Sequence, residues 1–376
     1  MILAELWAKY QLSLMILFNT SEMSLRMKDD KPTSFDIAYR AGVSQSTVSR
    51  ALRDSPLVNE ETRLKVHAIA KELNYKVDKN ARNLRSQKTK TIALLLCEDH
   101  CTSDSLINPF FLSMLGSITR ATANRGYDLL ISFQQASDDW HADFEDANRA
   151  DGIIFLGYGD YDRFVRKLTH LTEVGAHFIA WGPVLEGQPG VSIGCDNFKG
   201  AYIATQHLIS LGRKRIAFLG DVSDQSPEFE MRYRGFLKAL SDANIVFDSQ
   251  LQVTAETSKE EGYTSALLLQ EKGIEFDAIF GASDLISIGA MRALEDAGLR
   301  IPQDIAVIGF DDIPMASYTT PPLTTVQQNT PYAGELLVET LLKLVNGEQV
   351  ESMLLPATLV VRGSCSVNPS GKKTQR

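Results

Sequence analysis

The spacing of apolar residues changes about a quarter of the way along the chain. Between residues 33 and 75, apolar side chains recur every three or four positions, which is the spacing of amphipathic helices. From residue 91 onward, short apolar runs alternate with longer amphipathic stretches, which is typical of strands and helices in turn. The chain is therefore predicted to contain a small helical unit followed by a large α/β unit.

Polar caps and one glycine divide the first region into short helices. Thr33, followed three positions later by Asp36, is a capping arrangement that opens a first helix, and Gly42 can adopt the left-handed conformation that ends it. Ser44 caps a second helix and Asn59 caps a third. Two short helices across a tight glycine turn, supported by a third helix, predict a helix-turn-helix unit.

The second region contains apolar runs that are candidate strands, at residues 91–97, 127–132, 151–157, 177–181, 191–194, 215–220, 251–254, 277–281 and 305–309. The clearest helices are expected at residues 109–125, 198–211, 227–243, 259–271, 285–297 and 332–345. This alternation predicts an α/β fold of parallel sheets buried on both faces. The length is enough for two doubly wound lobes, with a ligand cleft between them at the carboxyl ends of the strands.

These patterns divide the chain into an N-terminal extension (1–30), a helix-turn-helix head (31–76), a hinge (77–90), a two-lobed body (91–366) and a tail (367–376). The extension contains an apolar stretch, but Glu5 and Lys9 interrupt it and no A-x-A cleavage pattern follows, which argues against a signal peptide. The stretch is too short for a membrane span. We expect the extension to be disordered, or to precede a working start at Met23 or Met27.

Charge is distributed unevenly along the chain. The whole chain has a net charge of −9. Residues 31–90 hold 13 basic and 6 acidic side chains, a net charge of +7, so the remainder carries −16. A basic head on an acidic body suits DNA binding, because cationic side chains release counterions from phosphate while the duplex repels an acidic body.

The sequence gives no sign of a metal site or of catalysis. The cysteines Cys97, Cys101, Cys195 and Cys365 are scattered, which suits a reducing cytosol. Cys97, His100 and Cys101 lie close in sequence, but no fourth metal ligand is apparent. The sequence has no Walker GxxxxGK[ST], no HExxH and no GxGxxG after a strand. We therefore expect neither an enzyme nor a bound metal or cofactor.

Motifs in both regions are similar to those of one protein family. The head contains Asp36-Ile37-Ala38, Ala41-Gly42-Val43-Ser44 and Thr47-Val48-Ser49-Arg50-Ala51-Leu52, and the hinge contains Ala81-Arg82-Asn83-Leu84. The body contains Asn108-Pro109-Phe110-Phe111, Asp196-Asn197-Phe198, Arg232-Tyr233-Arg234-Gly235-Phe236, Gly309-Phe310-Asp311-Asp312 and Pro321-Pro322-Leu323-Thr324-Thr325. In this order and spacing, the motifs resemble the lactose-repressor (LacI/GalR) family of transcription regulators. The resemblance implies a periplasmic-binding-protein-like body behind the DNA-binding head.

The resemblance places DNA contacts in the head. Gln45, Ser46 and Arg50 match the family's base-reading positions, since Arg can pair with guanine and Gln with adenine. Arg50 is alternatively a phosphate clamp or a solvated surface residue. Further candidate DNA contacts can act as helix caps or surface residues, as phosphate donors, or as both; they are Thr33, Ser44, Thr47, Ser49 and Asn59.

The resemblance also implies DNA contacts in the hinge. Leu84 matches the leucine that the family inserts into the minor groove, and Arg82 and Arg85 flank it on phosphates or on the other subunit. Leu84 could alternatively pack on the body. A single helical turn is marginal in water, so this turn is expected to fold only with DNA or a second subunit. Val77 and Asp78 replace the family's proline and asparagine, and we expect this to alter hinge folding or DNA affinity.

An effector site in the cleft is implied as well. Arg232, Asp311 and Asp196 match positions in or near the family's cleft, where Arg donates to sugar hydroxyls and Asp accepts from them. They could alternatively form salt bridges between the lobes. The remaining candidates are the motif residue Asn108, the aromatic residues that could form a sugar-binding wall or pack in the core, and a serine where relatives often have asparagine: Asn108, Phe110, Phe111, Trp181 and Ser283.

The function implied by the resemblance is repression of carbohydrate-utilisation genes in the cytoplasm, at the nucleoid. A mono- or disaccharide between the lobes would release the protein from its operator or, less commonly, recruit it. A homodimer or tetramer would read a pseudo-palindromic operator, without a membrane partner. A purine or another metabolite is the alternative effector. A periplasmic sugar-binding protein would share the body, but it would need an export signal and would have no use for the head.

Overall fold

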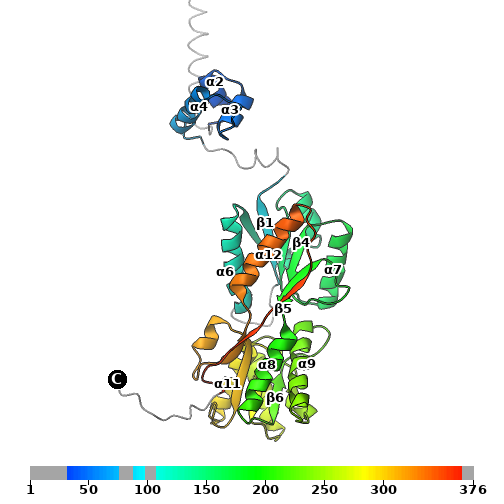
Figure 1. Cartoon of the computed structure of the whole chain (residues 1–376). Coiled ribbons are helices and arrows are strands. Elements are labelled where there is room, and N and C mark those ends of the chain that lie inside the picture. Colours follow the sequence, from blue (N-terminus) through cyan, green and yellow to red (C-terminus); the bar gives the residue numbers. More distant parts are fainter. Residues whose placement is uncertain (1–31, 76–87, 98–106, 366–376) are drawn as a thin grey trace, which may run out of the picture. The chain divides into compact units, whose positions relative to one another are not determined.

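The computed structural model describes residues 32–75, 88–97 and 107–365. The chain divides into two compact units, Met1–Arg85 and Ser86–Arg376. The first unit contains the head, and the second contains two lobes that we call the N-terminal lobe and the C-terminal lobe (Figure 1). The predicted extension, the predicted tail and most of the predicted hinge lie outside the described residues.

The head consists of three helices, α2 (Ser34–Ala41), α3 (Gln45–Ala51) and α4 (Glu60–Glu72). Gly42 follows α2 with φ of +69°, the left-handed conformation that the sequence predicted for this turn. Ile37, Val48 and Val66, one from each helix, are fully buried together. The predicted helix-turn-helix unit is therefore present, with a core small enough that these side chains fix the angles between its helices.

The N-terminal lobe contains a six-stranded parallel sheet in the order β11-β5-β4-β3-β1-β2. Its strands are β1 (Thr91–Leu96), β2 (Asp128–Phe133), β3 (Ile153–Leu156), β4 (Phe178–Trp181), β5 (Val191–Cys195) and β11 (Met353–Leu355). Its helices are α6 (Pro109–Asn124), α7 (Tyr161–Glu173) and α12 (Thr330–Val345), with short helical turns at Gln134–Ala136 and Ala142–Asp146. Helices α6 and α12 pack together on one face of the sheet (Figure 1).

Strand β1 illustrates why this sheet is buried on both faces. Successive side chains of a strand point to opposite faces, and the core on one side of β1 contains Ile92 and Leu94 while the core on the other contains Ala93 and Leu95. All four are fully buried. The uninterrupted apolar run in the sequence is therefore the pattern of a parallel strand covered by helices on both sides.

The C-terminal lobe contains a second six-stranded sheet in the order β12-β10-β9-β8-β6-β7, parallel except for β12. Its strands are β6 (Ile216–Leu219), β7 (Gln252–Val253), β8 (Ala278–Gly281), β9 (Ala306–Asp311), β10 (Thr324–Gln327) and β12 (Thr358–Val360). Its helices are α8 (Asn197–Ser210), α9 (Pro227–Asp242), α10 (Lys259–Glu271) and α11 (Asp284–Asp296), with 3₁₀ turns at Ser249–Leu251 and Pro314–Ser317.

Helices α8 and α9 pack closely because one of them carries a glycine at the contact. A Cβ atom at Gly235 of α9 would lie 2.1 Å from the carbonyl oxygen of Phe198 in α8. Any side chain at position 235 would therefore push the helices apart. This approach matters for the site described below, because α8 begins and α9 passes beside the space between the lobes.

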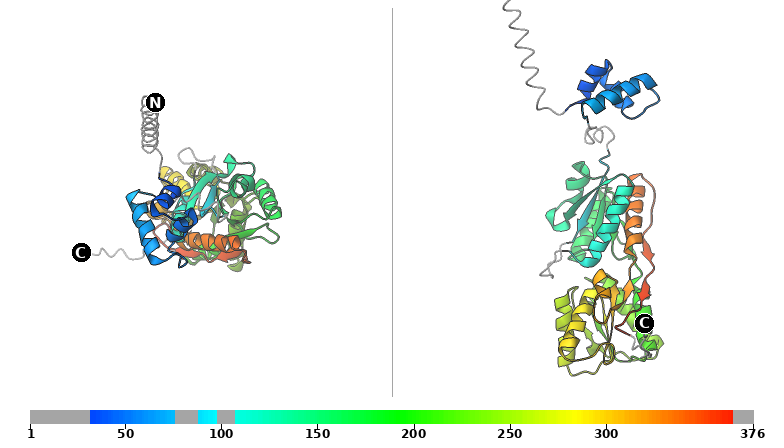
Figure 2. Two further views of the ribbon diagram at one scale, coloured as in Figure 1. Left: turned by 90° about the horizontal axis from the view of Figure 1, so that it is seen from above. Right: turned by 90° about the vertical axis from the view of Figure 1, so that its left-hand side faces the viewer.

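Within the described residues the chain passes between the two lobes three times. The passages connect β5 to α8, β10 to α12, and β11 to β12, which lie in or on different sheets (Figures 1 and 2). Several short connections side by side allow rotation of one lobe against the other while they resist separation of the lobes.

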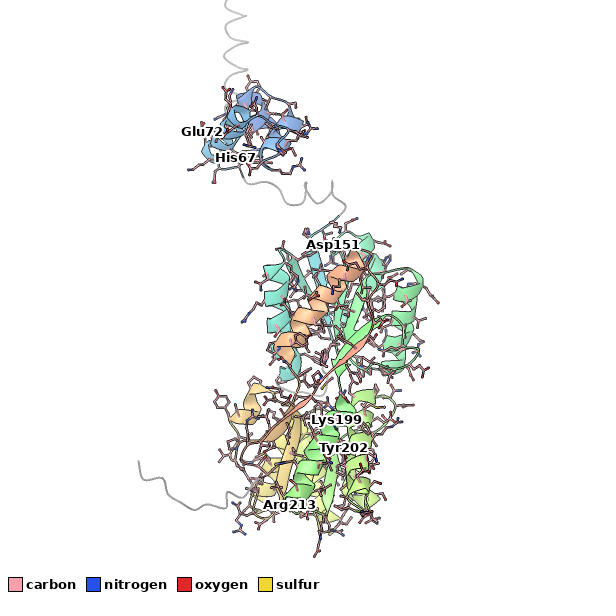
Figure 3. The ribbon with its side chains drawn as sticks, viewed as in Figure 1. His67, Glu72, Asp151, Lys199, Tyr202 and Arg213 are labelled. Carbon is pink, nitrogen blue, oxygen red and sulfur yellow. The ribbon has the colours of Figure 1, made fainter. Side chains whose placement is uncertain are left out.

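The residues that precede β1 are fixed to the N-terminal lobe by Asp151. Asp151 lies at the end of the N-terminal lobe where β1 begins (Figure 3). Its carboxylate accepts hydrogen bonds from the backbone amides of Thr89 and Lys90 at 2.5 and 3.0 Å. Lys88 adds a hydrogen bond to Asn346 at 2.9 Å. These contacts join the described end of the predicted hinge to the N-terminal lobe. No helix in the described part of the chain is long and apolar enough to cross a membrane.

Replacement of Phe218 by alanine tests the core of the C-terminal lobe. Phe218 is fully buried on β6, and the centre of its ring lies 5.1–5.5 Å from those of Tyr233, Phe236 and Phe280. We expect Phe218→Ala to lower the free energy of unfolding by about 3–5 kcal/mol, measured by urea denaturation followed by circular dichroism. Val246→Ala, at a 95% exposed position, is the control and should change it by less than about 0.5 kcal/mol.

Candidate functional site

A cavity of about 460 Å³ lies between the two lobes. It is found where the sequence analysis placed the cleft, at the carboxyl ends of the strands, because Trp181 and Cys195 end β4 and β5 on one side and Asp311 ends β9 on the other. The described lining comprises Cys97, Asn108, Phe110, Phe111, Gly157, Tyr158, Gly159, Trp181, Gly182, Cys195, Asn197, Asp221, Gln225, Ser226, Glu228, Phe229, Arg232, Glu256, Thr257, Asp311 and Gln328.

Aromatic rings form the N-terminal lobe's side of the cavity. The side chain of Asn108 caps α6 by accepting a hydrogen bond from the amide of Phe110 at 2.9 Å, and this cap starts the helix at the cavity wall. The ring centres of Phe110 and Trp181 lie 6.1 Å apart, and those of Phe110 and Phe111 lie 5.4 Å apart. Such a wall presents an apolar face to a ligand.

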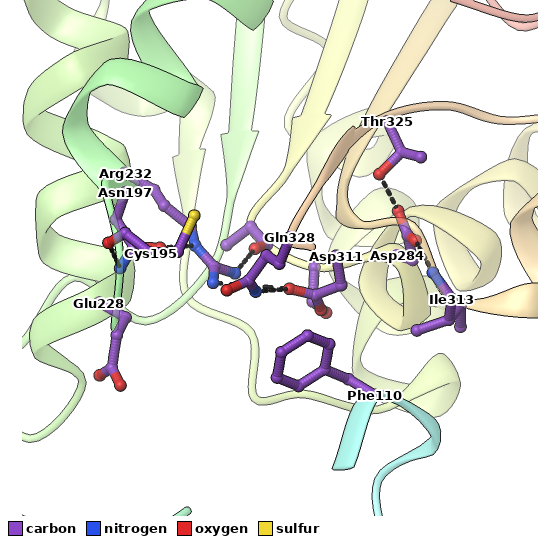
Figure 4. Close-up of polar contacts among 12 residues, drawn as sticks. Phe110, Cys195, Asn197, Glu228, Arg232, Asp284, Asp311, Ile313, Thr325 and Gln328 are labelled. Carbon is purple, nitrogen blue, oxygen red and sulfur yellow. Dashed lines mark hydrogen bonds and ion pairs between the residues drawn. The ribbon is translucent and has the colours of Figure 1, made fainter. Parts of the chain in front are cut away.

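The C-terminal lobe contributes a buried guanidinium, that of Arg232 in α9. Its Nε donates to Oδ1 of Asn197 at 2.8 Å, Nη1 donates to the carbonyl oxygen of Ala282, and Nη2 lies 3.5 Å from Oδ1 of Asp311 (Figure 4). The guanidinium carbon lies 3.8 Å from the centre of the Phe310 ring, which adds a cation–π contact. With Arg232 only 4% exposed, these partners take the place of water around its charge.

Asp311 is the carboxylate that faces Arg232. It ends β9 with φ of +118°, a backbone conformation that L-residues rarely adopt, so its side chain is held at the cavity at some conformational cost. Gln328 donates a hydrogen bond from Nε2 to Oδ1 of Asp311 at 2.7 Å. Burial raises the pKa of Asp311 to about 6, although Arg232 and Gln328 oppose this shift.

Asp284 is a second buried carboxyl group behind Asp311. It accepts hydrogen bonds from the hydroxyl of Thr325 at 2.5 Å and from the amide of Ile313 at 2.8 Å. Burial, and then the charge of Asp311, raise its pKa well above the ordinary value. Asp284 therefore fixes the chain that follows β9, and with it the position of Asp311.

Contacts between the lobes close one side of the cavity. The hydroxyl of Tyr158, from the N-terminal lobe, donates to the carboxylate of Glu228, from α9. Gln225 accepts from the amide of Tyr161 at 3.2 Å and donates to the carboxylate of Asp162 at 3.2 Å. Burial raises the pKa of Tyr158 well above its ordinary value and also raises the pKa of Glu228.

The structure brings together most of the effector-binding residues predicted from the sequence. The predicted residues that line the cavity are Asn108, Phe110, Phe111, Trp181, Arg232 and Asp311. The described lining does not include Asp196, which caps α8 by accepting from the amide of Lys199, or Ser283, which caps α11 and is buried. Arg232 and Asp311 do form the predicted alternative, an ion pair, but both belong to the C-terminal lobe.

Sequence reasoning missed polar residues of the lining that surround Arg232 and Asp311. Asn197 immediately follows the predicted Asp196, and Gln328 immediately follows β10. Tyr158 and Glu228 were missed as well. The usable signal was the position of polar residues directly after apolar strands, where a doubly wound sheet opens onto its ligand.

In the head, several of the predicted DNA-contacting residues act as helix caps. Ser44 accepts from the amide of Thr47 at 3.2 Å, and Asn59 accepts from the amide of Thr62 at 2.8 Å. The amide of Thr33 donates to the carboxylate of Asp36 at 2.7 Å. These contacts define the starts of α2, α3 and α4, and a capping side chain at an exposed helix start can still reach a phosphate.

The predicted base-reading residues differ in their surroundings. Ser46 and Arg50 are exposed on α3, whereas Gln45 is half-buried and donates from Nε2 to the hydroxyl of Ser34 at 2.8 Å. Ser49 accepts from Arg53 at 3.2 Å. The predicted hinge contacts Arg82, Leu84 and Arg85 lie outside the described residues.

Comparison with known proteins gives matches over both units. Residues 35–78 match the family described as bacterial regulatory proteins, lacI family, and residues 205–365 match a periplasmic binding protein-like domain. The ribose operon repressor of Escherichia coli strain K12 is 31% identical over 337 residues, which cover 88% of this chain and 99% of that protein. The HTH-type transcriptional regulator CelR of Thermobifida fusca is 30% identical over 345 residues, which cover 91% of this chain and 98% of that protein.

A solved structure is similar over nearly the same length. The lac repressor dimer bound to operator and the anti-inducer ONPF superimposes with a TM-score of 0.77 at 27% sequence identity. The match covers 90% of this chain and 100% of that chain. The similarity thus extends through both the head and the two lobes.

Replacement of Asp311 by a neutral residue tests whether the buried carboxylate lowers the stability of the folded protein. Because its folded-state pKa of about 6 lies above the ordinary value of 3.8, ionisation of Asp311 costs stability; the cost is absent below about pH 4 and complete well above pH 6. We expect Asp311→Asn to raise the melting temperature by a few degrees at pH 7.5.

The gain should shrink at pH 5, where Asp311 itself is largely protonated. Differential scanning calorimetry at the two pH values measures both melting temperatures. A variant that melts below the parent protein at pH 7.5 would show that the pair with Arg232 outweighs the cost of burial.

Proposed function

Since the chain belongs to the lacI family of bacterial regulatory proteins, we propose that it is a transcriptional repressor whose head binds operator DNA and whose cavity binds a small sugar. It acts by binding alone, without catalysis, in the cytoplasm where its DNA target lies. The sugar controls the affinity of the head for the operator, and sugar binding releases the protein from DNA.

One observation carries the sugar assignment, the arrangement of buried polar groups around Arg232 beside an aromatic wall. A pyranose has apolar C–H faces and a rim of hydroxyls that both donate and accept hydrogen bonds. Phe110 and Trp181 offer surfaces for the faces, while Asn197 and Asp311 offer oriented polar atoms for the rim. The cavity of about 460 Å³ falls within the range of small-ligand sites and would hold a mono- or disaccharide.

The head supports the DNA-binding half of the proposal. In a helix-turn-helix unit the second helix enters the major groove, and here that helix is α3. Its exposed Arg50 can donate two hydrogen bonds to a guanine edge, and the hydroxyls around Ser44 can reach phosphate. Two heads of a homodimer would read the two halves of a pseudo-palindromic operator, and Leu84 would enter the minor groove between them.

The lobes connect the two activities. A ligand that contacts both lobes stabilises one relative orientation of them, and the three chain passages allow the lobes to rotate. The N-terminal lobe carries the residues that lead to the hinge, anchored through Asp151. A change in its orientation in a dimer would therefore alter the separation of the two hinges and so the folding of the hinge turns on DNA.

Arg50→Ala tests DNA recognition by α3. With an operator first isolated from a random DNA pool, the variant should bind more weakly by about 1–3 kcal/mol per half-site, because a bidentate contact to guanine is lost. Fluorescence anisotropy measures the affinity. Arg40→Ala is the matched control, since Arg40 is engaged by Glu72 at 2.8 Å on another part of the head.

The two variants should also differ in sequence specificity. Arg50→Ala should lose discrimination at one base pair of each half-site, whereas Arg40→Ala should keep it. Equal affinities of Arg50→Ala and the parent protein for the operator would remove Arg50 from the base-reading set.

Arg232→Ala tests the ligand site. The variant should lose the change in operator affinity that an active sugar causes, while its operator affinity without sugar stays within about threefold of the parent's. Arg234→Ala is the control, because Arg234 lies two positions along the same helix and pairs with Glu230 on its exposed side. A sugar response retained by Arg232→Ala would contradict the assignment of the cavity.

A further inference from the structure

The described cavity lining holds more acidic than basic side chains. Among its described members, Arg232 is the only Lys or Arg, whereas the carboxylic acids are Asp221, Glu228, Glu256 and Asp311. Arg232 and Asp311 lie 3.5 Å apart and largely balance each other's charge. The remaining acids, Asp221, Glu228 and Glu256, form what we call the acidic rim, and Asp221 and Glu228 add negative charge to the potential that a ligand meets.

Arg232 offers little to an anionic ligand. Its Nε, Nη1 and Nη2 are directed at Asn197, Ala282 and Asp311, and its flat face lies over Phe310. An anion that paired with this guanidinium would compete with protein acceptors that already compensate its charge. Arg232 is thus arranged to order its neighbours rather than to capture a negative charge.

Two residues of the acidic rim are held in place by hydrogen bonds to their carboxylates. Asp221 accepts from the amide and hydroxyl of Ser223 at 3.0 and 2.9 Å and from the hydroxyl of Ser226 at 2.8 Å. Burial opposes ionisation of Asp221, but these hydrogen bonds outweigh it and lower its pKa. Burial raises the pKa of Glu228, but the hydrogen bond that its carboxylate accepts from Tyr158 across the gap between the lobes favours the ionised form and opposes this shift.

We propose that the cavity selects an uncharged sugar and rejects its anionic relatives, such as sugar phosphates and uronic acids, and that Asp221 and Glu228 enforce this selection. The partly enclosed, aromatic-walled site strengthens the repulsion, because charges interact more strongly where water is excluded. That the ligand is a sugar rests on the proposed function. The repulsion of anions follows from the lining alone.

Matched ligand pairs test the selection on the full chain. Isothermal titration calorimetry would compare ribose with ribose 5-phosphate, glucose with glucose 6-phosphate and glucuronate, and cellobiose with its 6-phosphate. For whichever neutral sugar binds, the anionic partner should bind at least tenfold more weakly. An anion that binds as tightly as its neutral partner, or more tightly, overturns the proposal.

Substitutions in the rim sharpen this test. Glu228→Gln and Asp221→Asn should each reduce the ratio of the affinity for the neutral sugar to the affinity for its anionic partner. Each substitution removes one negative charge and keeps the shape of the side chain. Glu230→Gln is the matched control, since Glu230 also lies in α9 but pairs with Arg234 at its surface. If Glu228→Gln and Glu230→Gln change this ratio of affinities by the same factor, the effect is one of overall charge, and the role given to the acidic rim is overturned.

A chemical probe makes the result independent of which sugar binds. Cys97 lines the cavity, and its thiolate displaces iodide from either iodoacetamide, which is neutral, or iodoacetate, which is an anion of almost the same size. Mass spectrometry of the Cys97 peptide gives the rate of alkylation by iodoacetamide divided by the rate of alkylation by iodoacetate. This ratio should exceed that of a short cysteine peptide at least threefold, and Glu228→Gln should lower it while Glu230→Gln leaves it unchanged.

The two experiments separate the two claims. If none of the neutral sugars binds but Cys97 discriminates against iodoacetate, the sugar assignment fails and the anion-rejecting cavity stands. If Cys97 alkylates with the ratio of the free peptide, the inference of an anion-rejecting cavity fails whatever the ligand is.

Discussion

Arg232 carries a permanent charge at a place that water hardly reaches, and removing such a charge from water costs several kcal/mol unless other groups surround it. The groups that do so come from distant parts of the chain: the start of α8, the loop after β8 and the end of β9. The C-terminal lobe must therefore be assembled in full before Arg232 is satisfied. Conversely, the guanidinium holds these three segments together at the floor of the cavity.

The arrangement is not optimised for stability. Asp311 adopts a rare backbone conformation, it is ionised with difficulty because it is buried, and the fully buried Asp284 lies behind it. A core of apolar residues in these places would cost less. Such costs are typical of binding sites, where polar groups are held ready for a ligand that completes their hydrogen bonds.

Most of the fold could be predicted from the sequence because its strands are buried on both faces. β1, β3 and β8 appear as continuous apolar runs, and glycines or polar residues follow them. β10 was not among the predicted strands. The short strand β11 was not predicted either, since Met353 and Leu354 are about half exposed. The partner of β11 is β5, which is far away in sequence, so no local sequence pattern predicts their pairing. The antiparallel direction of β12 likewise depends on the passage between lobes rather than on its residues.

The site was predictable where a motif carried it. Arg232, Asp311 and Phe110 lie in motifs that are informative on their own. Asn197 and Gln328 owe their positions to passages of the chain between the lobes, and Tyr158 and Glu228 meet only because the lobes face each other. Asp196 lies between the lining residues Cys195 and Asn197 but caps the start of α8, which shows how one step along the chain separates a lining residue from a cap. Ser283 likewise caps the start of α11.

The central claim is that sugar binding in the cavity and operator binding by the head are coupled. Coupling between binding sites is reciprocal, so a sugar that weakens operator binding by some factor must itself be bound more weakly by the same factor when operator is present. The decisive measurement is the affinity of the full chain for a sugar that binds it, by calorimetry, with and without saturating operator DNA. The account predicts equal factors in both directions, with sugar affinity reduced at least fivefold by operator. An unchanged sugar affinity would show that the two sites act independently and would contradict it.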